Sequence, residues 1–221
     1  MKLVHPILNQ PINWNECLIQ SFVIENPKMY REFVEELYQQ MEGSKGNFVL
    51  SEDNELLDLS KYAELISDII KINTDSKKII TGVIKDLTDI AINERHFEIL
   101  ELYRRINEEI SNIIFSSGID IVFDDINDIS QILKLYNVKP NDEKTTLAER
   151  ILFYMELCEK YLKKHLFIFF NLHSYFAKEE LELLFKNIQY SKYNVFIVER
   201  YDFIASIMEQ KRIIDIDLCE I

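Results

Sequence analysis

The sequence predicts an α/β protein with a helical insertion, and three observations point to this fold class. Strand-like apolar runs stand near both ends of the chain of 221 residues, whereas a helical period of apolar residues runs almost unbroken from about residue 60 to 162. Hydrophobic residues make up 48% of the chain, and only 4 Gly and 4 Pro interrupt it, which favours long helices. We therefore expect an α/β domain built from residues 1–60 and 163–221, and a helical domain built from residues 61–162.

The N-terminal part predicts strands followed by a helix. Residues 1–16 alternate weakly and indicate a β-hairpin that turns at Asn9-Gln10-Pro11. A strand over 18–25 runs directly into Asn26-Pro27, and Asn is a favoured N-cap while Pro is favoured at the first helical position. A further short strand, FVLS, follows this helix.

The rest of the chain predicts helices and then a second set of strands. Apolar residues at helical spacing form three stripes, namely Ile79, Ile80, Val83, Ile84, Leu87, Ile90 and Ala91; Ile99, Tyr103, Ile106, Ile110 and Ile113; and Leu147, Ile151, Tyr154, Cys158 and Tyr161. The strands that follow are HLFIFFN, YNVFIVE and RIIDID, with a helix over 177–187 between the first two. Two parallel strands joined by a helix make a βαβ unit.

Composition predicts an acidic cytoplasmic protein. The net charge is −13, and no segment is basic, which counts against the usual electrostatic footprint of a nucleic-acid-binding protein. Cys17, Cys158 and Cys219 are widely spaced, as is typical of thiols in a reducing compartment. The N-terminus lacks the apolar region of a signal peptide, and no apolar run approaches the roughly 20 residues of a membrane helix.

The strand ends do not carry the chemistry of an enzyme. The first strand–helix junction, FVIENPKMY, lacks the glycine-rich phosphate loop, Glu25 would repel phosphate, and Pro27 removes an amide donor. Asn171 stands where a nucleotide hydrolase would place a carboxylate for magnesium. His173 follows the same strand, but no nucleophile or metal motif accompanies it, so we interpret it as a loop histidine. We therefore expect a scaffold with no catalytic residues.

Two clusters of charge are candidate binding sites. Asp120, Asp124, Asp125 and Asp128 form an acidic run whose oxygens would suit calcium if a helix began near Asp124, although acids at helix N-termini also interact favourably with the helix dipole, and we favour that explanation. The basic candidates are Lys77, Lys78, Lys85, Lys134 and Lys139. Each basic cluster has acids nearby, so a solvated helix face is the default, but lysines repeated around a closed oligomer could act together on DNA.

Several stretches carry a resemblance to a known family. They are the C-terminal ERILFYMELCEKYLKKHLFIFFNLHSYFAKEELELLF with YNVFIVE, the patch GIDIVFDDI with KLYNVK and, more loosely, N-x-P-I and VIEN near the N-terminus. Together they resemble the Csn-two family of type II-A CRISPR–Cas systems.

The resemblance implies a fold and a function. It implies an α/β head similar to a degenerate P-loop fold without a nucleotide site, together with a helical leg domain. It also implies homotetrameric rings, supported by calcium, that bind ends of double-stranded DNA without sequence preference and without catalysis. The implied role is spacer acquisition together with the CRISPR integrase complex and the guide-dependent nuclease.

This sequence matches the site residues that the resemblance implies at some positions and departs from them at others. Asp120, Asp124 and Asp125 fall on acidic family positions, whereas Val122 and Ser130 stand where relatives can carry Glu. Two potential calcium ligands are therefore lost, and Asp128 is the candidate replacement for one of them. Lys134 and Lys139 match basic family positions. The segment SEDNELLDLSK is acidic where relatives are often basic, which moves the expected DNA contact to the helix of Lys77, Lys78 and Lys85.

Two other functions remain open at the level of sequence. An adaptor that keeps the fold but binds only proteins is favoured by the acidic segment and the net charge of −13. A nucleotide-binding enzyme on the same scaffold would require a phosphate site that the sequence does not supply.

Overall fold

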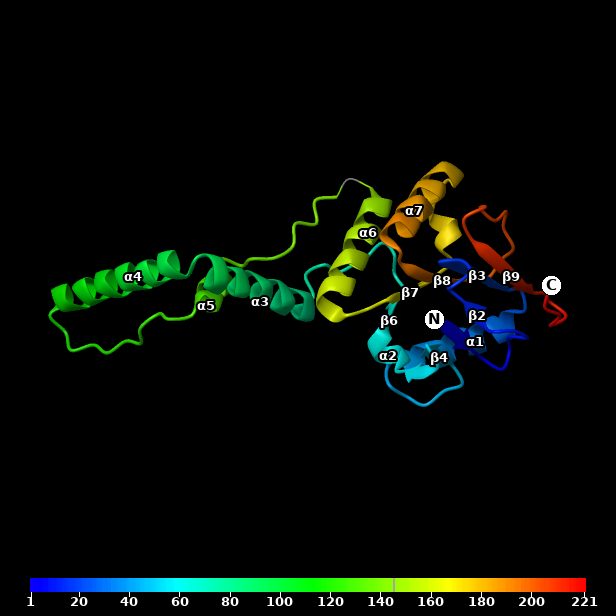
Figure 1. The fold of residues 1–221 in the computed structure, drawn as a ribbon, viewed down its shortest axis with the longest axis horizontal. Coiled ribbons are helices and arrows are strands. Elements are labelled where there is room, and N and C mark those ends of the chain that lie inside the picture. The colour runs from blue at the N-terminus through cyan, green and yellow to red at the C-terminus, as the bar shows by residue number, and fades with distance from the viewer. Residues whose placement is uncertain (145) are drawn as a thin grey trace. The chain divides into compact units, whose positions relative to one another are not determined.

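The computed structural model describes residues 1–144 and 146–221, which form two compact units (Figure 1). We call residues 1–73 with 142–221 the α/β unit, and residues 74–141 the helical unit. This division differs from the boundaries at 60 and 163 that we expected from the sequence. The difference arises because the stretches on either side of the helical unit contribute a strand and a helix to the α/β unit.

The α/β unit is built on a five-stranded sheet in the order β6-β7-β8-β3-β9, in which every neighbouring pair is parallel. Its strands are β3 (Ile19–Ile24), β6 (Ala63–Ile66), β7 (Leu166–Phe170), β8 (Asn194–Glu199) and β9 (Gln210–Ile214). The expected strands at both ends of the chain are confirmed, and so is the βαβ unit. We had assigned the residues of β6 to a helical region, and this was wrong. The pairing of Ala63 with Leu166 of β7 makes the segment a strand.

Helices and a small second sheet cover the two faces of this sheet. The helices are α1 (Pro27–Met41), α6 (Leu147–Leu157) and α7 (Lys178–Ser191). In β7, Leu166 and Ile168 belong to the apolar core that contains residues of α1, whereas Phe167 and Phe169 belong to the core that contains residues of α6 and α7. Both faces of the strand are therefore buried in apolar cores, which explains its unbroken apolar sequence.

The N-terminal residues fold into the expected hairpin. The second sheet has the order β2-β1-β4-β5 and is antiparallel; its strands are β1 (Lys2–Val4), β2 (Ile12–Asn13), β4 (Val49–Glu52) and β5 (Glu55–Leu57). Leu3, Ile12 and Leu50 join the core on the α1 side of the parallel sheet. The acidic segment SEDNELLDLSK is not a plain loop, because it forms β5 and the short helix α2 (Leu59–Tyr62).

The third apolar stripe belongs to the α/β unit rather than to the insertion. Ile151 and Met155 of α6 and Cys158 are buried against the sheet beside Phe185 of α7. Helix α6 continues as a π-helical turn, Cys158–Leu162, which leads directly into β7. The stripe had the correct period for a helix, but its period does not reveal which neighbour it packs against.

The helical unit consists of α3 (Lys77–Glu94), α4 (His96–Ser117) and α5 (Ile129–Leu135). An extended segment, residues 119–128, joins α4 to α5 and is held to α4 by Asn107. The side chain of Asn107 accepts the backbone N–H of Ile126 at 3.0 Å and donates to its carbonyl at 3.1 Å. No helix among the described residues is long and apolar enough to cross a membrane.

A buried ionic cluster holds the strand ends of the α/β unit together. His173 lies in a 3-10 turn after β7, and its Nδ1 stands 2.8 Å from Glu199 Oε1 while its Nε2 stands 3.2 Å from Glu209 Oε2. Their side chains are only 11%, 4% and 0% exposed, respectively. Ser21 donates its hydroxyl to Glu209, and the ring of Phe203 stacks on the imidazole with the ring centroids 3.7 Å apart. His173 is therefore a structural group and not a plain loop histidine.

We predict that His173→Gln lowers the free energy of unfolding in a pH-dependent way. Burial alone would lower the pKa of His173, but the hydrogen bonds that its ring donates to the carboxylates of Glu199 and Glu209 outweigh burial and raise the pKa to about 9. Since the folded pKa lies above the unfolded value of about 6.5, the stabilisation is complete below about pH 6.5 and disappears as the pH rises through about 9. The expected loss is about 3 kcal/mol near pH 6, measured by urea unfolding.

The exposed residue His96 supplies the control, because His96→Gln should leave stability unchanged at both pH values. A loss for His173→Gln of the same size at about pH 6 and about pH 10 would show that the charge of His173 does not stabilise the fold.

Candidate nucleic-acid interface in the helical unit

All of the predicted binding residues lie in the helical unit, between Lys77 and Lys139. Lys77, Lys78 and Lys85 project from α3 and are exposed. They form no ion pair with the residues that the structure describes, so their ammonium groups are accessible to a ligand. Lys78 and Lys85 are seven positions apart, which places them on one side of the helix, two turns from each other.

The other two lysines are partly engaged. Lys134 is exposed in the last turn of α5, a helix that contacts α3. Lys139 follows α5 and forms an ion pair with Asp75 at 2.7 Å. The charge of Lys139 is therefore balanced within the chain, and the three lysines of α3 are the stronger candidates for phosphate contacts.

The acidic run adopts a different conformation from the one we expected. No helix begins near Asp124; Asp120, Asp124 and Asp125 lie on the extended segment and are exposed. Asp128 is the N-cap of α5, since its carboxylate accepts the N–H of Ser130 at 2.8 Å and the hydroxyl of Ser130 at 2.7 Å. These hydrogen bonds lower the pKa of Asp128.

These acids do not converge into a calcium site within one chain. In the part of the chain that the structure describes, no three His, Cys, Asp or Glu side chains are grouped so that they could hold a metal ion. A calcium ion needs six to eight oxygen ligands, whereas Asp128 is committed to its cap. The residues that the structure describes therefore do not bring a calcium donor set together within one chain.

The most pronounced feature of the helical unit is its uncovered apolar surface. Helix α4 has no buried residue, and the apolar residues buried among residues 74–141 are Ile79, Ile84 and Ile129. Val122 is 93% exposed, Phe115 is 90% exposed and Phe97 is 83% exposed. The other large apolar residues exposed in this unit are Ile90, Ile92, Leu100, Leu102, Ile110, Ile113, Ile119, Ile121, Phe123, Leu135 and Tyr136. An exposed apolar surface of this extent marks an interaction site.

Sequence reasoning found the apolar stripe of α4 but not its exposure. Ile99, Tyr103 and Ile106 are half-buried in the structure, whereas Ile110 and Ile113 of the same stripe face solvent. The sequence did contain a sign of this exposure, because apolar residues such as Phe97 and Phe115 lie outside the stripe. One face of a helix cannot bury both these residues and the stripe.

Comparisons with known proteins identify the family of this chain. The sequence model of the family described as CRISPR-associated protein (Cas_Csn2) matches residues 40–218, which include the whole helical unit. This chain belongs to the Csn2 family. Over 203 residues it is 23% identical to the CRISPR-associated protein Csn2 of Streptococcus agalactiae, an alignment that covers 90% of this chain and 89% of that relative.

Family membership confirms the resemblance found in the sequence. It establishes a CRISPR-associated protein of the Csn2 family and agrees with a role in spacer acquisition. The match begins inside α1, so β1, β2, β3 and the Asn26 cap lie outside it.

We predict that Asp128 and the pair Asp124 and Asp125 act in different ways. Asp128→Ala should lower the free energy of unfolding by about 1 kcal/mol with or without calcium, because it removes an N-cap. Asp124→Ala with Asp125→Ala should leave stability in chelator unchanged within about 0.5 kcal/mol and should remove any gain that calcium gives. Thermal unfolding in calcium and in chelator measures both effects.

Glu182→Ala, at an exposed position of α7, is the control for loss of surface charge. If calcium stabilises the variant lacking Asp124 and Asp125 as much as the wild type, the calcium ligands lie elsewhere.

Proposed function

We propose that this Csn2-family chain is a non-catalytic protein that assembles into a homotetrameric ring and binds ends of double-stranded DNA during CRISPR spacer acquisition. The observation that carries the proposal is the combination, in one unit, of a large bare apolar surface and exposed lysines. The apolar surface needs a protein surface to cover it, and the lysines offer contacts to phosphate groups.

Assembly into a closed ring would account for the bare helices. A unit in which Ile79, Ile84 and Ile129 are the buried apolar residues among those described gains little stability from its own core. Copies of the same chain related by symmetry would present complementary helices to one another and cover these apolar residues. Closed symmetry would also repeat the lysines of α3 around a common axis.

Repetition would help an acidic chain to bind DNA. The net charge of −13 opposes DNA at long range, so a single set of Lys77, Lys78 and Lys85 would bind weakly. A lysine-lined passage brings several such sets to the same duplex, and each phosphate contact releases counterions. Contacts of this kind carry no sequence information, in agreement with binding without sequence preference.

The α/β unit supports a scaffold similar to a P-loop fold that lacks a nucleotide site. The amides of Lys28 and Met29 at the start of α1 already donate to Asn26 Oδ1, at 3.1 and 3.2 Å. At the end of β7, Asn171 accepts the N–H of Arg200 at 3.1 Å and donates to the hydroxyl of Tyr30 at 3.1 Å. The groups that could bind phosphate are therefore satisfied within the protein, which favours a non-catalytic role.

A protein-only adaptor is the second candidate function. The acidic β4–β5 hairpin and the net charge favour it, since acidic surfaces repel DNA. Such an adaptor would contact the CRISPR integrase complex and the guide-dependent nuclease, which are partners in the ring proposal as well. DNA affinity at low salt distinguishes the two.

We predict that the protein shifts linear duplex in a gel but not the same duplex as a closed circle. A ring must thread over an end, and the apparent affinity should fall with salt with a log–log slope of about −0.9 per phosphate contact. Equal binding to both forms would indicate contact on an open surface and would contradict the ring, whereas binding to neither would favour the adaptor.

The lysines supply the matched variants for this assay. Lys78→Glu with Lys85→Glu, and also Lys134→Glu with Lys139→Glu, should abolish duplex binding. Lys178→Glu with Lys186→Glu, on α7, changes the charge equally and should leave binding unchanged.

We predict that Ile110→Glu with Ile113→Glu converts the oligomer into monomers. Both side chains are exposed in the single chain, so the change should not disturb its fold, but burial of two carboxylates between subunits would be costly. Light scattering after gel filtration measures the mass. Leu56→Glu, at a position 77% exposed in the α/β unit, should retain the oligomer. A wild type that is monomeric at micromolar concentration contradicts the ring.

A further inference from the structure

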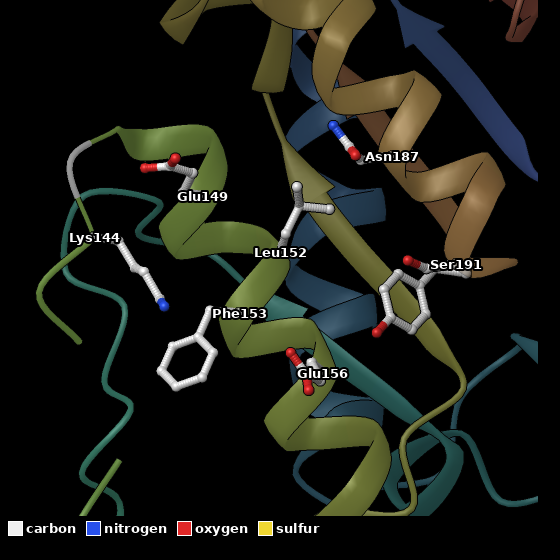
Figure 2. Close-up of a pocket in the computed structure, with 8 residues that line it drawn as sticks. Lys144, Glu149, Leu152, Phe153, Glu156, Asn187 and Ser191 are labelled. Carbon is white, nitrogen blue, oxygen red and sulfur yellow. The ribbon is translucent and has the colours of Figure 1, made fainter. Parts of the chain in front are cut away.

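A cleft of about 510 Å³ lies between α6 and α7 of the α/β unit. Figure 2 shows Glu149, Phe153 and Glu156 on α6, and Asn187 and Ser191 on α7. Tyr193 also lines the cleft and is buried. Nothing in the function proposed above uses this surface.

The cleft already holds a cation that comes from the chain itself. The ammonium group of Lys144 lies 4.5 Å from the centroid of the Phe153 ring, on the side of the cleft shown at the left of Figure 2. A cation over an aromatic face at this distance is attracted by the negative face of the ring. Lys144 precedes α6 in the chain, and its side chain is exposed, so it can leave the ring without disturbing the core.

The groups around Phe153 accept hydrogen bonds and carry negative charge. Glu149, Phe153 and Glu156 stand at i, i+4 and i+7, so a carboxylate lies one turn from the ring in each direction. Glu156 forms no ion pair with the described residues. Burial, and then the charges of Glu159 and Glu156, raise the pKa of Tyr193 to about 12.

The α7 side of the cleft adds a hydrogen-bond acceptor. The amide nitrogen of Asn187 uses one of its two N–H donors on the carbonyl of Leu183 at 2.8 Å, and its carbonyl oxygen is left for a ligand. One turn towards the start of both helices, a smaller apolar hollow of about 120 Å³ is lined by Leu147, Phe176 and Leu183. The surface therefore offers a place for a cation beside a place for an apolar side chain.

We propose that this cleft docks an arginine or lysine side chain, flanked by an apolar residue, of a protein partner, and that Lys144 is its internal competitor. A planar aromatic ring one turn from the carboxylate of Glu156 matches the face and the N–H donors of a guanidinium group. The negative charges of Glu149 and Glu156 repel phosphates, so nucleic acid is not the occupant. The proposal does not rest on DNA binding, because the cleft and the lysines of α3 lie in different units.

The test uses the full chain and a defined probe, the acetylated and amidated peptide Ala-Leu-Arg-Leu-Ala carrying a neutral dye. Fluorescence polarisation compares it with the same peptide in which citrulline, which is uncharged and of the same shape, replaces arginine. The arginine peptide should bind at least about fivefold more tightly. Lys144→Gln should tighten its binding about two- to fivefold, because the competing cation is gone.

Matched variants separate the cleft from the overall acidity of the chain. Glu156→Gln should weaken the arginine peptide about fivefold or more, whereas Glu35→Gln, an equal change of charge at an exposed position of α1, should have no effect. Equal losses in the two variants, equal binding of the citrulline peptide, or no gain from Lys144→Gln would each overturn the proposal. None of these results alters the DNA assay, so failure here is distinguishable from failure of the ring.

Discussion

The α/β unit depends on one constraint, the parallel pairing of β7, β8 and β3 with both faces covered. Each of these strands is hydrogen-bonded to a neighbouring strand on both sides, and each face of the sheet is buried in its own apolar core. Strand β3 lies near the start of the chain and β8 near its end. Their pairing therefore requires the C-terminal part of the chain to pack beside the N-terminal part. Helices α1, α6 and α7 then take the only faces left to cover, and the helical unit becomes an excursion between β6 and β7.

The same constraint accounts for the contacts of the polar groups at the strand ends. Asn26 caps α1, Asn171 joins Tyr30 to the backbone of Arg200, and His173 is clamped between Glu199 and Glu209. Each polar group spends its hydrogen bonds on holding strand ends in place, and buried polar groups must be satisfied in this way. The functions that we propose therefore use surfaces away from the strand ends, namely the helical unit and the α6–α7 cleft.

The helical unit, in contrast to the α/β unit, buries few of its apolar residues. Its helices form from local signals, with Ser76 as the N-cap of α3 and Asp128 as the N-cap of α5, yet little apolar surface is buried between them. Most helical stability in proteins comes from packing of an apolar face rather than from propensity. In the ring that we propose, association would cover these helices and add stability, so assembly and order in the helical unit should be coupled.

The sequence by itself determined the α/β class, the hairpin, the cap at Asn26 and the βαβ unit, because these features follow from local periods and short-range hydrogen bonds. It also indicated the family through motifs spread along the chain. Only the tertiary structure decided that residues 63–66 pair with β7, that α6 packs on the parallel sheet, and that Asp128 serves as a cap. The same holds for His173 and for the exposed half of α4. A period shows that a face is apolar, but which partner covers that face depends on contacts between residues far apart in the chain.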